Sequence, residues 1–306
     1  MTNKKNDHKC LIFIINWQQC EETKELLTNT CFNRDRFDIF IFDNESTTIT
    51  EKFFTENKSL YDHYKNSPTN LGFATPCNIG LDFADKHGYE FIFFLNNDVI
   101  ISNNDAEIVL NETIYNKNVA LASPLIKDII THNTTFSGAR LVKDPPLIEH
   151  ISPNELQDNI NTHNYLLYGT ALMGRVKLLR DIGGFYEPFF AYWEDCLLSI
   201  SLIDHGYACA VIKNANVFHK NDRSGELDTP QSQYYYYYLV RNEIIFWKKV
   251  IKNPIKPIYW LIQNKYKDCI YLLKISAYTQ IMAILSGLFD GLMGIHGKWN
   301  KHIRKT

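Results

Sequence analysis

The sequence predicts an α/β protein in which a mostly parallel central sheet is flanked by helices. Apolar runs of strand length alternate with helical segments through the first half of the chain. Runs such as Cys10–Asn16 contain almost no polar residue, which is typical of strands buried on both faces. Repeated strand–helix units of this kind form one sheet with helices on both sides.

Length and composition set the limits of this prediction. The chain has 306 residues, of which 45% are hydrophobic and 22% charged. These values are ordinary for globular proteins and exclude disorder, collagen and coiled coil as descriptions of the whole chain. The length corresponds to one large domain or two smaller ones, at roughly 150 residues per domain.

Each element of the first half follows from its own pattern. Apolar runs predict strands, and longer stretches with a helical period separate them. Thr75 is expected to cap the third helix, and Gly88 to end it. The expected strands are Cys10–Asn16, Phe37–Phe42, Tyr61–Tyr64, Phe91–Leu95 and Val119–Ser123. The expected helices are Glu21–Leu27, Ile49–Asn57, Thr75–His87 and Asp105–Tyr115.

The second half is less regular. Its expected strands are Phe136–Val142, Tyr165–Met173, Ala208–Ile212 and Asn216–His219. Its expected helices are Val176–Asp181, Glu194–His205 and the aromatic-rich Tyr234–Val250. Two or more amphipathic helices are expected in residues 254–306, after Pro254 and Pro257.

Charge is distributed unevenly along the chain. Residues 248–306 hold 11 of the 32 lysines and arginines but only 2 of the 34 acids, Asp268 and Asp290. Such a basic segment suggests an anionic partner, either a membrane surface or nucleic acid, although a solvated basic face is an equally common explanation. Charged residues interrupt its apolar runs, so we expect it to lie on a membrane and not to span one. Packing on the rest of the chain, or a dimer interface, is the alternative.

The cysteines indicate a reducing compartment. Seven cysteines are widely spaced and form no C-x-x-C pair, as expected for free thiols in a cytosolic protein. The apolar run Leu11–Ile15 is too short for a signal peptide and is predicted to be a strand.

Polar clusters follow three of the predicted strands. Asn16, Asp43–Ser46 and Asn96–Asp98 stand where strands end, and open α/β sheets bind ligands at that edge. Each cluster alone is more often a turn or a helix cap. Three on successive strand ends favour a ligand site. The chain has neither a G-x-G-x-x-G fingerprint after the first strand nor a P-loop, which argues against dinucleotide and P-loop enzymes.

Two further sets of residues carry candidate chemistry. Asp98 suits Mg²⁺ or Mn²⁺, which prefer oxygen ligands and share them with phosphates. His219 follows the last predicted strand and is a weaker metal candidate, since a lone histidine is more often structural. Glu194 and Asp195 open a helix after an aromatic run. The helix dipole alone accounts for acids there, but an aromatic pocket would also raise a carboxylate pKa towards that of a general base.

Taken in order, these motifs resemble glycosyltransferase family 2, especially its bacterial rhamnosyltransferase-like branch. The resemblance runs from Leu11 to about Gly297. Each motif is weak alone, and the ordered set is specific. The matching stretches are Phe42–Ser46, Asn70–Phe73 with Asn78, Leu95–Val99, Gly169–Met173, Gly183–Phe185 with Glu187, Phe190–Asp195, Gly206–Tyr207, His219, Arg241–Asn242 and Gly287–Leu292.

The resemblance implies a GT-A fold and an inverting, metal-dependent transfer of a sugar from a nucleotide-sugar. It implies that Asp43 binds the base or ribose, that Asp98 and His219 bind Mn²⁺ or Mg²⁺, and that Asp195, beside Glu194, is the catalytic base. Arg241 would lie near the diphosphate. The donor side would comprise Asn16, Asp43, Asn44, Ser46, Asn70, Gly72, Phe73, Asn78, Asn96, Asn97 and Arg241. The acceptor side would comprise Gly169, Thr170, Tyr192 and Trp193.

The same resemblance gives an organisation and a set of partners. Residues 1–250 would form the catalytic domain, with a nucleotide-sugar half (1–125) and an acceptor half (126–250), and residues 251–306 a basic helical extension. The donor would be a dTDP-, UDP- or GDP-sugar, and the acceptor a glycan or lipid-linked glycan. The positive charge and apolar runs of residues 251–306, and not the resemblance, lead us to expect that this extension binds an anionic membrane at its cytoplasmic face. We expect no nucleic acid partner, and a homodimer stays open.

Two alternatives and three departures accompany this interpretation. A sugar-phosphate nucleotidyltransferase would carry a glycine-rich basic loop after the first strand, where this chain has Trp17–Cys20. A non-catalytic membrane-associated protein of the same fold would not need Asp98, Asp195 and His219. Asn96 replaces the first acid of the D-x-D-type motif, and Leu197 and Ser201 stand where an acid and an arginine are common. These departures bear on the sugar and acceptor and not on the reaction class.

Overall fold

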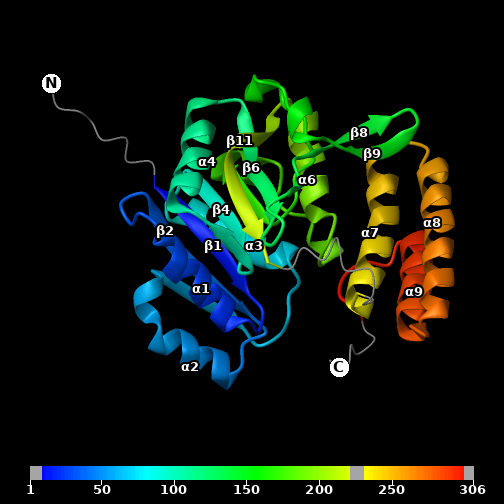
Figure 1. The fold of residues 1–306 in the computed structure, drawn as a ribbon, viewed down its shortest axis with the longest axis horizontal. Coiled ribbons are helices and arrows are strands. Elements are labelled where there is room, and N and C mark those ends of the chain that lie inside the picture. Colours follow the sequence, from blue (N-terminus) through cyan, green and yellow to red (C-terminus); the bar gives the residue numbers. More distant parts are fainter. Residues whose placement is uncertain (1–8, 221–230, 300–306) are drawn as a thin grey trace.

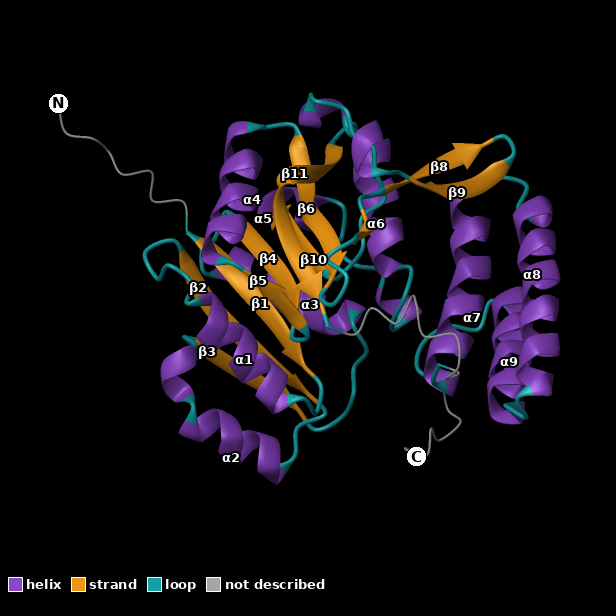
Figure 2. Ribbon diagram, viewed as in Figure 1, coloured by secondary structure: helices purple, strands orange, loops and turns teal. Residues whose placement is uncertain are grey.

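One central sheet organises the molecule, as the computed structural model of residues 9–220 and 231–299 shows (Figure 2). Within these residues the sheet has nine strands in the order β3-β2-β1-β4-β10-β6-β11-β5, with β7 paired to β6. The strands are β1 Cys10–Asn16, β2 Phe37–Asn44, β3 His63–Ser67, β4 Phe91–Asn96, β5 Val99–Ile101, β6 Val119–Asp128, β7 Thr134–Phe136, β10 Ala171–Arg175 and β11 Ala208–His219.

The strand directions bring three carboxyl ends together. Strands β3, β2, β1 and β4 are parallel, so β1, β2 and β4 end at the same edge. Strand β10 runs antiparallel to β4 and β6, with Ala171 opposite Leu95. Residues 169–170, just before β10, therefore reach the same edge as the ends of β1, β2 and β4.

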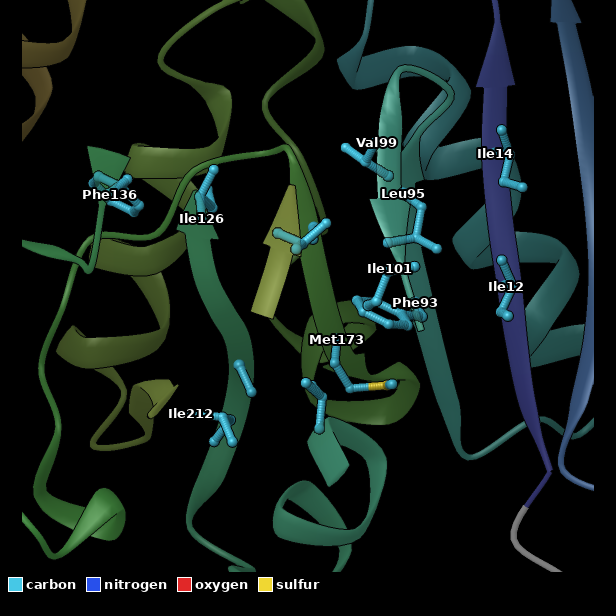
Figure 3. Close-up of a cluster of buried hydrophobic side chains, with 14 of the residues drawn as sticks. Ile12, Ile14, Phe93, Leu95, Val99, Ile101, Ile126, Phe136, Met173 and Ile212 are labelled. Atoms are coloured by element: carbon cyan, nitrogen blue, oxygen red, sulfur yellow. The ribbon is translucent and has the colours of Figure 1, made fainter. Parts of the chain in front are cut away.

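Helices cover both faces of the sheet (Figure 1). Successive residues of β1 point to opposite faces, so Ile12 and Ile14 join one buried cluster and Leu11 and Phe13 the other. Figure 3 shows the first cluster, where Ile12 and Ile14 of β1 lie beside β4 and Met173 of β10 lies on the far side of β4. The helices are α1 Cys20–Thr30, α2 Thr48–Glu56, α3 Ala74–Lys86, α4 Asn103–Tyr115, α5 Val176–Asp181, α6 Glu194–Asp204, α7 Gln233–Val250, α8 Ile255–Lys274 and α9 Tyr278–Met293.

The structure departs from the expected elements at several places. The strand expected over Tyr61–Tyr64 runs over His63–Ser67, and the two strands expected over Ala208–Ile212 and Asn216–His219 form the single strand β11. The strand expected over Tyr165–Met173 is formed only from Ala171. The strand expected over Phe136–Val142 is broken at Gly138, whose φ of +98° ends β7 and directs β8 (Ala139–Lys143) into a separate hairpin with β9 (Pro146–His150). Thr75 does not cap α3, because the helix begins one residue earlier and the Thr75 hydroxyl donates to Glu187.

The C-terminal helices form a layer beside the sheet. Helix α9 packs along α7, and α8 packs against α9 (Figure 1). Gly287 and Gly291 allow the close approach of α9. A Cβ at these positions would lie 2.7 Å from the Tyr237 carbonyl oxygen and 2.9 Å from that of Arg241. In the part of the chain that the structure describes, no helix has the length and apolarity to cross a membrane. The division of the chain into domains stays a prediction.

The close contact of Gly287 and Gly291 with α7 predicts that alanine at these positions destabilises the protein, although alanine is the better helix former. Alanine favours a helix over glycine by about 1 kcal/mol. Overpacking a tight contact costs about 1–3 kcal/mol. We therefore expect the combined Gly287→Ala and Gly291→Ala variant to unfold at a lower temperature than the wild type, with Leu292→Ala on the exposed side of α9 as the control. A higher melting temperature would contradict the close packing of α9 on α7.

Candidate active site

A cleft of about 750 Å³ opens at the shared edge of β1, β2 and β4. It gathers residues from both halves of the chain, because the segment before β10 and the loop before α6 reach this edge. The predicted site residues that line it are Asn44, Asn70, Gly72, Phe73, Asn96, Asn97, Asp98, Gly169, Thr170, Tyr192, Trp193, Glu194, Asp195 and His219.

Asp43 lies beneath the cleft with Asn16. Both side chains are fully buried and neither lines the cleft. Asp43 Oδ1 accepts a hydrogen bond from the Asn16 amide at 2.8 Å, and Oδ2 accepts from the hydroxyls of Thr50 at 2.6 Å and Tyr64 at 3.2 Å. All three of these hydrogen bonds come from side chains of the protein itself. Ser46 does not line the cleft either; its half-buried side chain contacts the Thr50 hydroxyl.

The loop after β3 is fixed by one buried amide. Asn44 Oδ1 accepts from the Leu71 N–H at 2.8 Å, and its Nδ2 donates to the Gly72 carbonyl at 2.9 Å. Gly72 has a φ of +81°, and a Cβ there would lie 2.2 Å from the Phe190 carbonyl oxygen. Only glycine fits this position, so Gly72 shapes the cleft with its backbone.

Asp98 and His219 meet at one end of the cleft. Asp98 Oδ1 lies 3.2 Å from His219 Nε2, and their side chains are only 15% and 20% exposed. The carboxylate is a suitable ligand for Mn²⁺ or Mg²⁺, which prefer oxygen, and a neutral imidazole is a common metal ligand in proteins. The described ranges 9–220 and 231–299 hold no cluster of three or more metal-ligating side chains. An ion here would thus take further ligands from water and a bound molecule, as Mg²⁺ commonly does.

Glu22 faces this corner and was not predicted from the sequence. It lies in the first turn of α1, and burial together with the negative charge of Asp98 raises its pKa. Glu25 lies three residues after Glu22 on α1, so the two acids share one side of the helix. The Glu25 carboxylate pairs with the Lys220 ammonium at 2.5 Å, so this side of α1 faces residue 220.

Glu194 and Asp195 line the same cleft at the start of α6. Asp195 Oδ2 accepts from the Gly169 N–H at 2.7 Å, and Oδ1 accepts from the Cys196 N–H at 2.7 Å. Burial raises the pKa of Asp195, and these two donors oppose that rise. Glu194 is 3% exposed, and its Oε2 has no hydrogen-bond partner among the described residues. Burial, then the neighbouring Asp195, raise the pKa of Glu194 well above its usual range. Asp195 is therefore the more easily ionised of the two.

The aromatic loop before α6 is strained and tightly held. Phe190, Tyr192 and Trp193 all have positive φ, which is costly for residues with side chains. The Phe190 carbonyl accepts from the Phe73 N–H at 2.6 Å. Asn242 Nδ2 lies within hydrogen-bond distance of the carbonyl oxygens of Phe189, Ala191 and Tyr192, at 2.9, 2.6 and 2.9 Å.

Two predicted donor residues support this loop from behind. Arg241, predicted to lie near the diphosphate, does not line the cleft: its side chain is fully buried and donates to the carbonyls of Phe189 at 2.7 Å and Gly297 at 2.5 Å. Asn78 is also outside the cleft lining, since its amide bonds Phe185 and Glu187. The polar groups of both residues are thus engaged within the protein.

Residues that the sequence left unassigned complete the wall. Trp17 and Tyr234 stack at 6.2 Å, and Tyr168 stacks on Phe136 at 3.7 Å. The tyrosine run 234–238 was a visible signal, whereas the β8–β9 hairpin was not. The unassigned lining residues are Ile15, Trp17, Gln19, Ile148, His150, Tyr168, Ala191, Cys196, Tyr234, Tyr235 and Leu239.

Comparison with known proteins identifies what the chain is similar to. The sequence profile described as Glycosyl transferase family 2 matches residues 12–183. A search of curated proteins finds no match. Among solved structures, a mannosyltransferase from Pyrobaculum calidifontis in complex with GDP-Man and Mn²⁺ aligns with a TM-score of 0.60 at 12% identity, over 96% of this chain and 88% of that one.

Two further structures have the same fold. Residues 1–349 of TarS from S. aureus, in complex with UDP-GlcNAc, align with a TM-score of 0.58 at 17% identity, over 94% of this chain and 81% of that one. GalNAc-T7 with UDP, GalNAc and Mn²⁺ aligns with a TM-score of 0.59 at 12% identity, over 80% of this chain and 48% of that one. These likenesses confirm the predicted GT-A fold.

The burial of Glu194 predicts a pH dependence of stability. Because its pKa is raised in the folded state, the folded chain keeps a proton that the unfolded chain releases above the usual glutamate pKa of about 4.3. The wild type therefore loses stability as pH rises through that window, by up to about 1.4 kcal/mol per pH unit. Glu194→Gln is neutral at every pH and escapes this loss.

Urea unfolding at several pH values measures the effect. The stability of Glu194→Gln relative to wild type should increase as pH rises above the usual glutamate pKa of about 4.3. The same substitution at the exposed Glu21 is the control. A stability difference that stays constant with pH would mean that Glu194 is not held protonated in the folded protein.

Proposed function

This chain belongs to glycosyl transferase family 2, and we propose that it moves a sugar from a nucleoside-diphosphate donor to a hydroxyl of a growing surface glycan, with inversion at the anomeric carbon. The observation that carries the proposal is the cleft. The Asp98–His219 pair and the Asp195 carboxylate line one cavity, so a charge-neutralising corner and a proton acceptor face the same space.

The donor would occupy the half of the cleft formed by the strand ends. Asn44, Asn96 and Asn97 line this half and offer amide groups to the nucleotide. Solved structures of similar fold contain GDP-Man with Mn²⁺ and UDP-GlcNAc, which supports a nucleotide-sugar donor, whether UDP-, GDP- or dTDP-linked. Asp43 would act on the base or ribose indirectly, by fixing Asn16 and the strand end from below.

Asp98 and His219 would hold the metal. A bound Mn²⁺ or Mg²⁺ would neutralise charge that develops on the leaving diphosphate. The partial burial of Asp98 strengthens its electrostatic influence on a ligand in the cleft. The buried Arg241 side chain does not line the cleft. Among the described residues, positive charge for the diphosphate would therefore come from the metal at Asp98 and His219, with Lys220 next to His219 in the chain.

Asp195 would accept the proton of the acceptor hydroxyl. The acceptor oxygen attacks the anomeric carbon, the bond from that carbon to the diphosphate oxygen breaks, and the hydroxyl proton moves to Asp195. The Gly169 and Cys196 N–H groups orient the two oxygens of Asp195. They also lower its pKa, so Asp195 would lose its proton more easily than Glu194. Glu194, more buried, would carry a proton and leave one negative charge on the pair.

The acceptor half is aromatic. Tyr192, Trp193, Tyr168 and Tyr234 line it and present ring faces suited to stacking on a sugar. Gly169 and Thr170 contribute backbone at the same place, where a side chain on Gly169 would crowd Phe73 and Asp195. The rhamnosyltransferase-like branch, a deoxyhexosyl or hexosyl donor, and O-antigen, capsule or similar surface glycan made at the cytoplasmic face of the membrane remain our more specific proposals.

The role of Asp195 is tested by Asp195→Asn. Asparagine keeps the shape and cannot accept the proton. General-base catalysis contributes about 10²–10⁴-fold, so transfer turnover should fall by that factor while binding of the nucleotide-sugar persists. The control is Asp204→Asn, an exposed acid on the same helix. Release of UDP, GDP or dTDP from a panel of nucleotide-sugars gives the rate, and a near-normal rate in Asp195→Asn would remove this residue from the mechanism.

The metal proposal predicts a requirement and a site. Turnover should be lost in a chelator and return with Mn²⁺ or Mg²⁺, and Zn²⁺ should not be needed at a site without cysteine ligands. Asp98→Asn should weaken Mn²⁺ binding, measured by the loss of the free Mn²⁺ spin-resonance signal, whereas Asp181→Asn on α5 should not. Full turnover in chelator would show that the chain stabilises the diphosphate without a metal.

A further inference from the structure

Helix α8 exposes an apolar stripe to solvent. Tyr259, Ile262, Tyr266, Ile270 and Leu273 recur every three or four residues, so they share one face of the helix. Each is at least 39% exposed, and Tyr266 is 68% exposed. The opposite face carries Leu261 and Leu272, which are buried.

Helix α9 has a matching stripe. Tyr278, Met282, Leu285, Phe289 and Leu292 recur with the same spacing and are all at least 48% exposed. The other side of α9 presents Gly287 and Gly291 to α7. Together the two stripes form what we term the α8–α9 face, defined by these ten residues. Monomeric proteins rarely expose so large an apolar surface without a partner.

The two stripes flank one seam on the same side. Cys269 and Leu272 of α8 meet Ile281 and Leu288 of α9 in one cluster between the helices. The helices are antiparallel, joined by the short link 275–277. In each helix the exposed stripe lies about a quarter-turn around the helix axis from the seam residues. Because the two helices run in opposite directions, these two quarter-turns lead to the same side of the helix pair. Both stripes therefore face the same way.

A row of lysines borders the stripe of α8. Lys256, Lys267 and Lys274 are exposed and separated by eleven and seven residues, three and two helical turns, so they lie in line. The two acids of these helices are turned away from the face: Asp268 pairs with Lys265 at 2.7 Å, and Asp290 accepts from the Tyr237 hydroxyl at 2.5 Å. The face is therefore apolar with a basic border and no carboxylate.

We propose that the α8–α9 face docks on an anionic lipid bilayer. The apolar stripes enter the boundary between headgroups and acyl chains, and the three lysines contact acidic headgroups. Tyr259, Tyr266 and Tyr278 suit that boundary, since each ring has an apolar body and a polar hydroxyl. The helices lie along the surface, because their inner sides are occupied by α7.

The charge pattern selects a bilayer over a second copy of the chain. In a symmetric dimer each copy offers the same patch, so the lysine rows would find no acid in the partner's α8–α9 face. An anionic bilayer can bury the apolar stripes and also place acidic headgroups beside the lysines. The docking rests on this face alone and is independent of the sugar-transfer chemistry.

The β8–β9 hairpin connects the face to the cleft. Lys143 and Pro146 of the hairpin line a hollow with Ile255, Lys256 and Tyr259 at the start of α8. Ile148 and His150 of the same hairpin line the active-site cleft. Figure 2 shows the hairpin reaching over towards α8. A docked molecule would thus hold the acceptor side of its cleft beside the bilayer.

Vesicle co-sedimentation of the full-length protein tests the proposal. Wild type should pellet with vesicles of phosphatidylcholine and phosphatidylglycerol at low salt, bind less at high salt, and bind vesicles of phosphatidylcholine alone more weakly. Lys256→Glu, Lys267→Glu and Lys274→Glu together should weaken binding by about 100-fold or more, at roughly 1 kcal/mol per lysine. The matched control reverses three exposed lysines elsewhere, Lys58, Lys86 and Lys117, and should bind like wild type.

A second variant tests the apolar stripe. Met282→Gln, Leu285→Gln and Phe289→Gln change only exposed positions of α9 to a good helix former, so circular dichroism should be unchanged while vesicle binding is lost. Three results would overturn the proposal. They are wild-type protein that stays in the supernatant with anionic vesicles, equal loss of binding in both lysine triples, and a solution dimer that the glutamine triple dissociates.

Discussion

The structure depends on how one strained loop is held. Residues 189–193 carry three non-glycine residues with positive φ, and they lead directly into Glu194 and Asp195. The carbonyls of this loop are engaged from two sides. The Phe73 N–H at the start of α3 binds Phe190, and Asn242 with Arg241 on α7 binds Phe189, Ala191 and Tyr192. Such strain persists only where the surroundings over-determine it, and here it aims Asp195 into the cleft.

This constraint links parts of the chain that are distant in sequence. Gly72 must lack a side chain because the Phe190 carbonyl occupies that space, and Asn44 at the end of β2 fixes the Gly72 loop in turn. On the other side, Arg241 also binds the Gly297 carbonyl, and α9 packs on α7 through glycines. The donor half, the aromatic loop and the C-terminal helices are therefore one connected support for the cleft.

The sequence predicts the part of the site that local rules control. Parallel strands end at one edge, so Asn44, Asn96–Asp98 and the strands before them were correctly grouped, as was the mostly parallel sheet. It did not reveal the reversed β10, which needs a long-range pairing with β4 to place Gly169. The family resemblance suggested that Arg241 lies near the diphosphate, whereas its side chain is buried behind the loop and outside the cleft lining. The Arg241 guanidinium donates to the backbone carbonyls of Phe189 and Gly297, and the sequence does not show that these distant residues come close to it. Ile148 and His150 were missed because the hairpin's position is equally non-local.

We propose that this clamped loop sets Asp195 in the same cleft as an Asp98–His219 corner that holds metal and diphosphate. A crystal structure of the protein soaked with Mn²⁺ and UDP, and in parallel with Mn²⁺ and GDP, tests it most directly. We expect electron density for Mn²⁺ in contact with Asp98 and His219, for the diphosphate beside it, and for the nucleoside above the ends of β1 and β2, with Asp195 open to the remaining space. A nucleotide bound away from Asp98, or a loop 189–193 that turns Asp195 out of the cleft, would contradict it.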